Sequence, residues 1–220
     1  FDEADLMKLQ RTFGYTAEDL KILMAPMALN GQEPVGSMGV DTPLAVLSDR
    51  EQLLFNYFKQ LFAQVTNPPV DPLREELVMS VETALGSERN LFEETPDHCH
   101  QISLKSPSLT DEQMTQLKEI EEGQILSRTF PIFFKKSGGD KSMEESLDEL
   151  CEQASAAVVD GIHILILSDR GSTEELVPIP SLLAVAAVHH HLIREGTRTK
   201  VGIVIETGEA REVMHFALLM

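Results

Sequence analysis

The sequence has few basic side chains, few cysteines and no long apolar run, and each shortage excludes a class of protein. Its 220 residues hold 18 lysines and arginines against 36 aspartates and glutamates, a formal net charge of −18. Nucleic acids and anionic membranes are bound mainly through an excess of basic side chains, so we expect neither nucleic acid nor a membrane as a partner. No apolar run approaches the length that spans a membrane, which is typical of a globular protein.

The two cysteines, Cys99 and Cys151, are too few for a disulfide framework. Disulfides persist in oxidising compartments, so their shortage favours a reducing compartment such as the cytoplasm. The length suits one substantial core, or two small domains that share an interface. The chain begins at Phe1 and ends in the apolar run Phe216–Met220, and we expect it to be a piece of a longer protein.

An apolar helix between two loops, within residues 34–76, is the most distinctive part of the sequence. The loops are rich in Gly, Pro, Ser, Thr, Asn and Asp, which adopt unusual backbone angles or bond to nearby backbone groups. Ser48 or Asp49 is the expected helix cap, and the prolines within residues 68–72 stiffen the loop that follows. The side chains that recur at helical spacing are Leu53, Leu54, Tyr57, Phe58, Leu61, Phe62 and Val65.

The rest of the first 124 residues predicts further helices and loops. Thr16 and Asp19 have the pattern of a capping box for a helix over residues 17–29. Pro26 lies inside that helix, where its ring and missing N–H should end or kink it. Other predicted elements are a helix from Asp71–Pro72, undecided between helix and extended chain after Val78, a short strand at Gln101–Leu104 and a helix from Thr110 to Glu121.

From residue 125 onward, the pattern changes to alternating strands and helices. The predicted strands are Ile125–Phe134, Ile162–Leu167 and Val201–Ile205. Ser142 with Glu145 predicts a capping box before a helix that stops at Gly161, and Pro180 begins another helix. Such repeats imply parallel strands with right-handed crossovers. The predicted fold class is α/β, with a helical and loop-rich N-terminal half followed by β/α units that resemble an incomplete TIM-type barrel.

Two histidine clusters contain metal-ligand atoms without the spacing that a metal needs. His189–His191 follow one another on a predicted helix, where successive side chains point about 100° apart. In His98–Cys99–His100, adjacent side chains would alternate faces on a strand, and no second ligand cluster has suitable spacing. We therefore predict no metal site in the chain.

Three loops offer a place for an anion or an active site. Gly36–Gly39 has backbone amides for an anion but no lysine at phosphate-loop spacing, and Lys135–Gly139 is a basic loop after a strand. Ser168–Gly171 follows a buried strand, where α/β proteins place active sites. In the alternative, structural interpretation, Asp169 and Arg170 pair with one another or cap the next loop. Because no nucleophile and base are discernible, the structural interpretation is favoured.

Gln64, Thr66 and Asn67 are polar side chains that leave the apolar helix and enter the stiff loop. None of them titrates, so they can hydrogen-bond a neutral polar molecule without protonating it. Turn chemistry alone equally allows a second interpretation, in which they bond within the loop and end the helix.

Two motifs of this sequence resemble the central domain of glutamate synthase. They are SMG-x-D-x-PLAVLS at residues 37–48 and YFKQLFAQVTNPP-x-DP-x-RE at residues 57–75, and FGYTAEDL, LGSERNL and LILSDR occur in the expected order. In that family the central domain lies between an N-terminal glutaminase domain and a C-terminal flavin domain. The resemblance implies one central domain over residues 1–220, with a helix- and loop-rich part at 1–124 and a β/α part at 125–220.

The resemblance implies a role in glutamate biosynthesis and ammonia assimilation. The family takes ammonia from glutamine at one site and adds it to 2-oxoglutarate at another. FMN and an iron–sulfur cluster supply the electrons, fed by ferredoxin or a nicotinamide nucleotide. This chain is implied to connect the two sites and to line part of the ammonia tunnel. The tunnel-lining candidates are Gln64, Thr66 and Asn67, and the interdomain loop candidates are Ser37, Met38, Gly39 and Asp41.

Neither a catalytic residue nor a cofactor is expected within the chain itself. The family's nucleophile is the cysteine that begins the mature enzyme, whereas position 1 here is Phe1, and two cysteines lack the cluster signature. The expected partners are the glutaminase and FMN-binding domains of the same polypeptide, with ferredoxin or a nicotinamide-dependent subunit for the full enzyme. The expected location is the cytoplasm, or the plastid stroma in a eukaryote. Two alternatives stay open: a stand-alone α/β enzyme with its site at Ser168–Gly171, and a pure interdomain scaffold.

Overall fold

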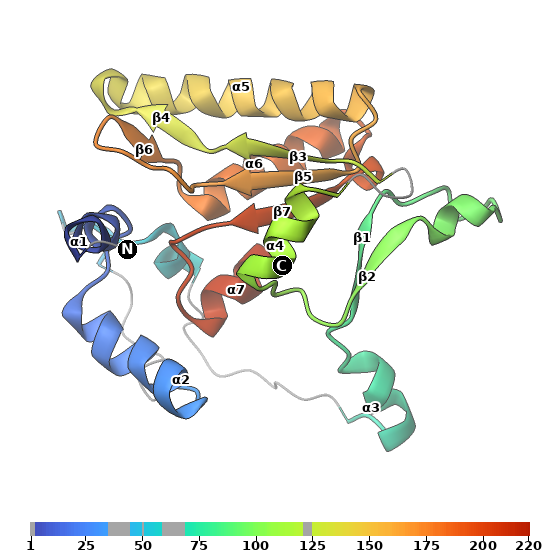
Figure 1. Cartoon of the computed structure of the whole chain (residues 1–220), viewed down its shortest axis with the longest axis horizontal. Coiled ribbons are helices and arrows are strands. Elements are labelled where there is room, and N and C mark those ends of the chain that lie inside the picture. Colours follow the sequence, from blue (N-terminus) through green and yellow to red (C-terminus); the bar gives the residue numbers. More distant parts are fainter. Residues whose placement is uncertain (1–2, 35–44, 50, 59–68, 121–124) are drawn as a thin grey trace.

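The computed structural model describes residues 3–34, 45–49, 51–58, 69–120 and 125–220 (Figure 1). Its centre is a parallel three-stranded sheet with the strand order β3-β5-β7. These strands are β3 (Ser127–Pro131), β5 (Ile164–Ser168) and β7 (Gly202–Glu206). Ile164 pairs with Ser127 on one side and with Gly202 on the other. The prediction of three parallel strands in these regions is confirmed, and the sheet is not a closed barrel.

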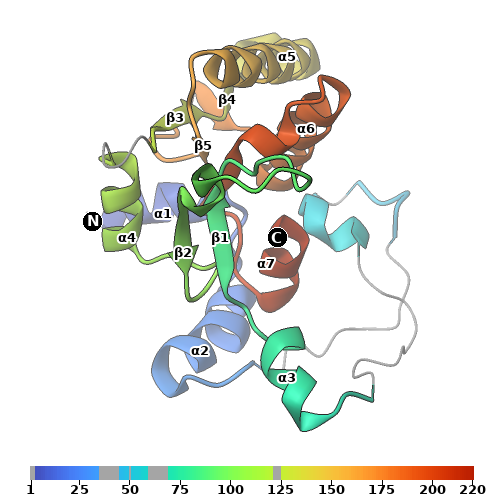
Figure 2. The same cartoon turned by 90° about the vertical axis from the view of Figure 1, so that its right-hand side faces the viewer.

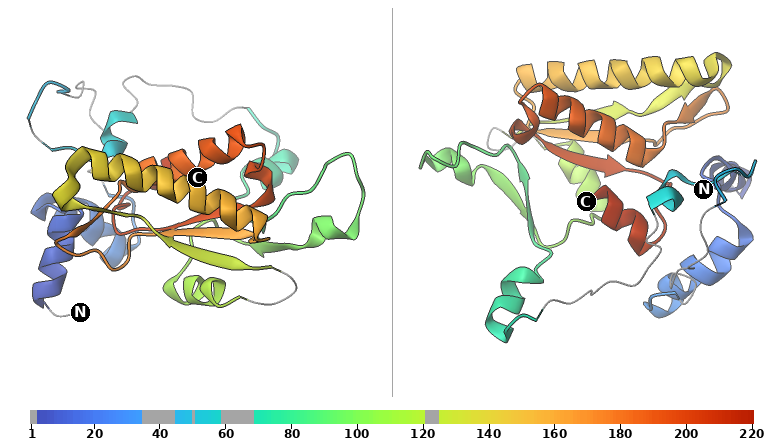
Figure 3. Two further views of the ribbon diagram at one scale, coloured as in Figure 1. Left: turned by 90° about the horizontal axis from the view of Figure 1, so that it is seen from above. Right: turned by 180° about the vertical axis from the view of Figure 1, so that it is seen from behind.

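Both faces of this sheet are covered, as the uninterrupted aliphatic run of β5 indicates. The covering elements are α4 (Asp111–Lys118), α5 (Gly139–Val159), α6 (Ser181–Arg194) and the antiparallel hairpin of β1 (Thr83–Gly86) and β2 (Gln101–Leu104). Leu165 and Leu167 are fully buried in the cluster formed with α5 and α6. Ile164 and Ile166 are fully buried in the cluster formed with α4 and the hairpin. Figures 2 and 3 show these two layers on opposite sides of the strands.

The predicted strand at residues 125–134 is divided between two sheets. β3 ends at Pro131, and β4 (Phe133–Lys135) pairs antiparallel with β6 (Leu176–Pro178). Ile132 lies between the two strands, where its N–H donates to the carbonyl oxygen of Ser168 at 2.9 Å. An apolar run shows that a segment is buried but does not show where one strand ends and the next begins.

The two long helices differ in how well their beginnings were predicted. α5 begins at Gly139, before the predicted cap Ser142, so that prediction was wrong. The hydroxyl of Ser142 instead accepts a hydrogen bond from the N–H of Lys135 at 3.2 Å, which ties β4 to the helix. α6 begins directly after Pro180, as predicted. Gly161 follows α5 with a positive φ of 78°, a conformation that glycine adopts without steric cost.

The N-terminal part consists of α1 (Glu3–Thr12) and a continuous helical segment from residue 17 to residue 30. The capping box is confirmed, because the N–H of Thr16 donates to Oδ2 of Asp19 and the N–H of Asp19 donates to Oγ1 of Thr16. Pro26 does not end this segment. A π-helical stretch at Asp19–Met24 precedes α2 (Ala25–Asn30), and its wider turn accommodates a residue that lacks an N–H.

The remaining elements are shorter. They are α3 (Pro72–Val78), α7 (Val213–Leu219) and the 3-10 helices η4 (Pro96–Cys99), η5 (Lys136–Gly138) and η6 (Arg198–Lys200). Asp71 caps α3 and Thr110 caps α4, both as predicted. The segment after α3, undecided from sequence, leads into β1. Among the described residues, no helix is both long and apolar enough to cross a membrane.

The predicted apolar helix of residues 53–65 is described only in its first part, the 3-10 helix η3 (Leu54–Phe58). Its buried side chain is Phe55, which is fully enclosed and was not among the residues of the predicted stripe. Tyr57 and Phe58, which the stripe did include, are more than half exposed. Leu53 and Leu54, also in the stripe, are half-buried, so in this part the helical period predicted the buried face only partly.

Candidate functional site

The residues predicted to act in the tunnel and at the domain joint lie outside the described part of the chain. These are Gln64, Thr66 and Asn67, together with Ser37, Met38, Gly39 and Asp41. The loop Gly36–Gly39, considered for an anion, also lies outside it. The described candidate is therefore the end of β5 at Ser168–Gly171, together with the groups that surround it.

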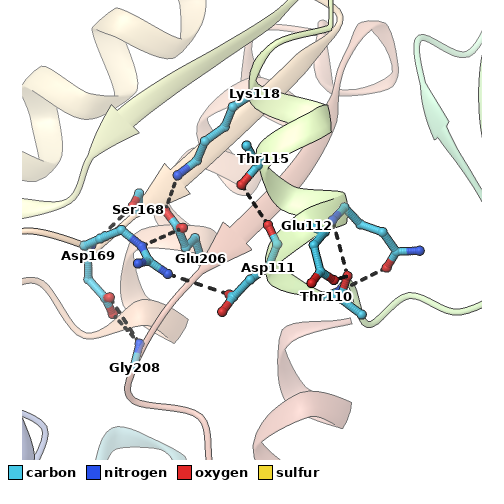
Figure 4. Close-up of polar contacts among 11 residues, drawn as sticks. Thr110, Asp111, Glu112, Thr115, Lys118, Ser168, Asp169, Glu206 and Gly208 are labelled. Atoms are coloured by element: carbon cyan, nitrogen blue, oxygen red, sulfur yellow. Dashed lines mark hydrogen bonds and ion pairs between the residues drawn. The ribbon is translucent and has the colours of Figure 1, made fainter. Parts of the chain in front are cut away.

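Glu206, the last residue of β7, accepts hydrogen bonds from three residues in two other parts of the chain, α4 and the end of β5. Its Oε2 accepts from Nζ of Lys118 at 2.8 Å and from the hydroxyl of Ser168, and its Oε1 accepts from Nε of Arg170 at 3.0 Å (Figure 4). Burial alone would raise the pKa of Glu206, but the hydrogen bonds and positive charges around it hold that pKa below its ordinary value. Nη2 of Arg170 also lies 3.7 Å from Oδ1 of Asp111, so α4 is tied to the same edge.

Asp169 caps the loop that follows β7. Its Oδ2 accepts from the hydroxyl of Thr207 at 2.5 Å. Both of its carboxylate oxygens lie 3.1 Å from the N–H nitrogen of Gly208 (Figure 4). The side chain is buried, and this desolvation raises the pKa of Asp169 to about 6. Asp169 and Arg170 do not bond to one another. Of the two structural interpretations of this strand end, the structure supports capping of a loop.

Glu209 holds the first turn of α6. Its Oε2 accepts from the N–H of Ser181 at 2.8 Å and from the hydroxyl of Ser181 at 2.6 Å, and both residues are buried. The first N–H groups of a helix have no partner within the helix, and the helix dipole favours a negative charge there. Oγ1 of Thr207 accepts a hydrogen bond from the N–H of Glu209 at 3.0 Å, which fixes the turn at residues 207–209. Because the same hydroxyl donates to Asp169, Thr207 connects Asp169 with Glu209.

Arg211 binds the N-terminal segment from within the β7–α7 loop. Its side chain is only 2% exposed. Nη1 lies 3.2 Å from both the carbonyl oxygen of Gly14 and Oδ2 of Asp19, and Nη2 donates to the carbonyl oxygen of Phe13. The guanidinium carbon stands 3.9 Å from the centre of the Tyr15 ring, a cation–π contact. A buried guanidinium is thus neutralised by one carboxylate and held by backbone carbonyls.

His215 links this loop to η3. Its Nδ1 accepts the N–H of Arg211 at 3.2 Å, and its Nε2 lies 3.2 Å from Oε1 of Glu212. The imidazole is 1% exposed and stacks on the ring of Phe55, with centroids 4.3 Å apart and planes 13° from parallel. Figure 3 shows α7 next to the short helix that carries Phe55.

Comparison with known proteins identifies the family of this chain. The family model described as the glutamate synthase central domain matches residues 8–220. The chain belongs to this family. It is 49% identical over 217 residues to the glutamate synthase [NADPH] large chain of Bacillus subtilis, which covers 99% of this chain and 14% of that protein. It is 42% identical over 221 residues to the ferredoxin-dependent glutamate synthase of Pyropia yezoensis. That match covers 100% of this chain and 14% of the relative.

A further relative is the glutamate synthase [NADH] of Saccharomyces cerevisiae. It is 46% identical over 209 residues, which cover 94% of this chain and 10% of that protein. This chain therefore spans only 10–14% of the length of these relatives, whereas the matching segments cover 94–100% of this chain.

In this glutamate synthase central domain, the histidine clusters bond to other parts of the fold. Nδ1 of His189 accepts from Nε of Arg198 at 2.9 Å, whereas Nε2 of His191 lies 2.8 Å from Oγ of Ser155. The two rings point to different elements, as expected for neighbours on a helix. His98 lies in η4, before the strand at Gln101–Leu104, and its Nε2 lies 3.0 Å from the carbonyl oxygen of Asn90. Within the described ranges, no three His, Cys, Asp or Glu side chains are grouped to hold a metal ion.

Sequence reasoning found one of the strand ends that build this site and missed the other. Ser168 to Arg170 follow a strand, and the rule that drew attention to them applies equally to Thr207 to Glu209 after β7. The carboxyl ends of parallel strands meet at one edge, so the two segments had to lie together. No such rule singles out Arg211 or His215, whose distant partners Phe13, Gly14, Asp19 and Phe55 all lie in the first quarter of the chain.

Proposed function

We propose that the chain is the central domain of a glutamate synthase and connects a glutaminase domain with an FMN-binding domain in one polypeptide. The observation that carries this proposal is the family match over residues 8–220, together with relatives that contain the whole matching segment as 10–14% of their length. The full protein would convert glutamine and 2-oxoglutarate into glutamate, with a reductant. In this assignment residues 1–124 and 125–220 are two parts of one central domain.

The polar network at the sheet edge supports a connecting role for this domain. Asp169, Glu206, Glu209 and Arg211 each have partners within the protein, drawn from helices, strands and the N-terminal segment. An active site needs groups that are free to meet a substrate, whereas a joint needs groups that satisfy one another. The second arrangement is the one seen here, which disfavours a stand-alone enzyme with its site at Ser168–Gly171.

The residues of this chain do not fit the iron–sulfur cluster that the family uses. Such clusters are held by three or four cysteine thiolates, and the sequence has two cysteines, of which Cys99 is exposed and Cys151 is buried. We therefore assign the cluster, FMN and the contact with ferredoxin or a nicotinamide-dependent subunit to other parts of the full enzyme.

We further propose that Gln64, Thr66 and Asn67 line part of an ammonia passage. Ammonia in water is protonated to ammonium, which is a poor nucleophile, so its transfer between two sites requires a path from which water is excluded. Side chains that do not titrate can hydrogen-bond ammonia without protonating it. The hydroxyl of Thr66 and the amide of Asn67 are groups of this kind. Ser37, Met38, Gly39 and Asp41 are proposed to contact a neighbouring domain.

The test uses the full-length enzyme that contains this chain, with Thr66→Val and Asn67→Leu. The first variant keeps the side-chain shape and removes the hydroxyl, and the second obstructs the passage. We expect glutamine hydrolysis to continue while 2-oxoglutarate amination falls behind, with ammonia released into solution. The measurement is the ratio of glutamine hydrolysed to 2-oxoglutarate consumed.

Thr83→Val is the matched control, because Thr83 is exposed at the start of β1. It should keep the two rates equal. If the Thr66 and Asn67 variants also keep both rates equal and undiminished, the passage is elsewhere and the loop is only a structural joint.

A further inference from the structure

Arg211 recognises one conformation of the N-terminal segment. Its Nη1 and Nη2 groups donate to the carbonyl oxygens of Phe13 and Gly14, and its Nε donates to the carbonyl oxygen of Glu209 at 3.2 Å. Two successive carbonyls can converge on one guanidinium only if the chain turns there, and Gly14 has a positive φ of 66°. We define the Arg211 joint as Arg211 with its partners Phe13, Gly14, Tyr15 and Asp19.

The Arg211 joint is continuous with the carboxyl edge of the sheet. The hydroxyl of Tyr15 donates to the carbonyl oxygen of Gly208 at 2.8 Å, and the N–H of the same glycine donates to Asp169. Burial raises the pKa of Tyr15, so its hydroxyl stays a donor at neutral pH. The ring of Phe13 packs so closely on Gly208 that a Cβ at that position would lie 2.7 Å from it.

The same joint is continuous with η3 through a second set of contacts. The N–H of Arg211 donates to His215, and the imidazole of His215 stacks on Phe55. Segments around residues 13–19, 54–58 and 206–215 are therefore held at one place, although they are far apart in the sequence. In the sequence, η3 directly precedes the segment that contains the proposed passage residues.

We propose that Arg211 is a positioning residue that couples glutamine hydrolysis to glutamate formation, an inference that rests on the proposed function. The N-terminal segment would be the part of this domain nearest in sequence to the glutaminase domain. By holding that segment at the sheet edge, at a position linked to η3 through His215, the Arg211 joint fixes where ammonia enters this domain relative to where it leaves. A loosened joint leaves each active site intact and lets ammonia escape between them.

The decisive variant is Arg211→Lys in the full-length enzyme. An ammonium group keeps the positive charge but cannot reproduce the planar fork that reaches several carbonyls at once. We expect the ratio of glutamine hydrolysed to 2-oxoglutarate consumed to rise at least about twofold, since small misplacements of groups that must align have large effects on rate. Hydrogen exchange of the amides at residues 13–20 should become faster in the same variant.

Arg198→Lys is the matched control. Arg198 is a half-buried arginine just before β7, at the end of that strand opposite to Arg211. Its Nε donates to the side chain of His189, and its Nη1, like that of Arg211, donates to a backbone carbonyl, here that of Val201 at 2.7 Å. If Arg211 serves stability alone, both variants melt at lower temperature and neither changes the ratio, which would overturn the proposal. Unchanged exchange at residues 13–20 in Arg211→Lys would overturn it as well.

Two further arms separate this inference from the proposed function. If Arg211→Lys fails to fold, Asp19→Asn is used, because it keeps the size of the side chain and removes the carboxylate that pairs with the guanidinium among the described residues. The same rise in ratio is expected, and an unchanged ratio contradicts the joint. If Thr66→Val uncouples the two reactions while the joint variants do not, the joint is refuted and the passage stands. A native enzyme that forms no glutamate from glutamine and 2-oxoglutarate refutes the proposed function itself.

Discussion

Replacing Asp169 by Asn should remove a pH dependence of stability that the buried carboxyl imposes. Asp169 is 5% exposed, and its pKa in the folded chain is about 6 against an ordinary value of 3.8. Because the folded-state pKa is raised, the folded chain binds the proton more tightly than the unfolded chain does between these values. The contribution of this group to stability is therefore present at low pH and is lost as pH rises through about 6.

The size of the effect follows from the two pKa values. Their difference, about 6 minus 3.8, corresponds to about 3 kcal/mol over the whole window at 1.36 kcal/mol per unit. Between pH 5 and pH 7 this group should lower the free energy of unfolding by about 1.4 kcal/mol, since only one pH unit of the window between the two pKa values lies above pH 5. This narrower range lies above the sequence pI of 4.7, at which a chain without net charge tends to precipitate.

The assay is urea denaturation of the 220-residue chain and of Asp169→Asn at pH 5, 6 and 7. Other carboxyl groups titrate as well, and Glu206, whose pKa is lowered, acts with the opposite sign. The informative quantity is therefore the difference in unfolding free energy between the two chains. This difference should move in favour of the variant by about 1.4 kcal/mol from pH 5 to pH 7. A difference that stays constant across this range would show that Asp169 is not held in a desolvated site.

Two further substitutions test the packing and the helix cap around the same edge. Gly208→Ala should lower the free energy of unfolding by about 1–3 kcal/mol, because its Cβ would lie 2.7 Å from the ring of Phe13. Adding Phe13→Leu should restore part of this loss. A Gly208→Ala variant as stable as the parent chain would contradict the close contact. Ser181→Ala should cost about 1–3 kcal/mol in urea denaturation because buried Glu209 loses a hydroxyl donor at 2.6 Å. Ser155→Ala, at a half-buried hydroxyl, is the control and should cost less; equal losses would argue against a special role for the cap.

The parts of the fold that sequence predicted are those fixed by local patterns. The run Ile164–Leu167 is aliphatic without interruption, and a strand covered on both faces places every such side chain in the interior. The caps Thr16, Asp71 and Thr110 also follow from short-range chemistry, because each bonds to backbone groups two or three residues away.

The parts that sequence missed are fixed by contacts with distant residues. β1 is a four-residue strand whose pairing with β2 and whose packing through Leu85 decide its conformation. Ser142 has a capping pattern, yet a hydrogen bond from β4 takes its hydroxyl and the helix starts earlier. Phe55 is buried because His215 lies against it, which the period of its own helix does not reveal.

The candidate site shows the same limit more sharply. Ser168 to Arg170 were recognisable as a strand end, but their role depends on partners 36 to 38 residues further along the chain. Arg211 is one of 18 basic residues, and its partner Phe13 is 198 residues away. Nothing in the local sequence marks it, because its surroundings exist only after the N-terminal segment has docked.

Buried charge is an uncertain source of net stability, so its presence at this edge calls for another reason. Transfer of a guanidinium and carboxylates out of water costs several kcal/mol for each ion, and apolar residues of similar volume often stabilise a fold equally well. Removing one member of such a network, however, leaves its partner buried without compensation, so few other arrangements of the segments are compatible with it. The network around Asp169 and Arg211 therefore specifies a position more than it adds stability. In the function that we propose, the domain keeps two distant reactions aligned, and an apolar contact that tolerates sliding would serve that role less well.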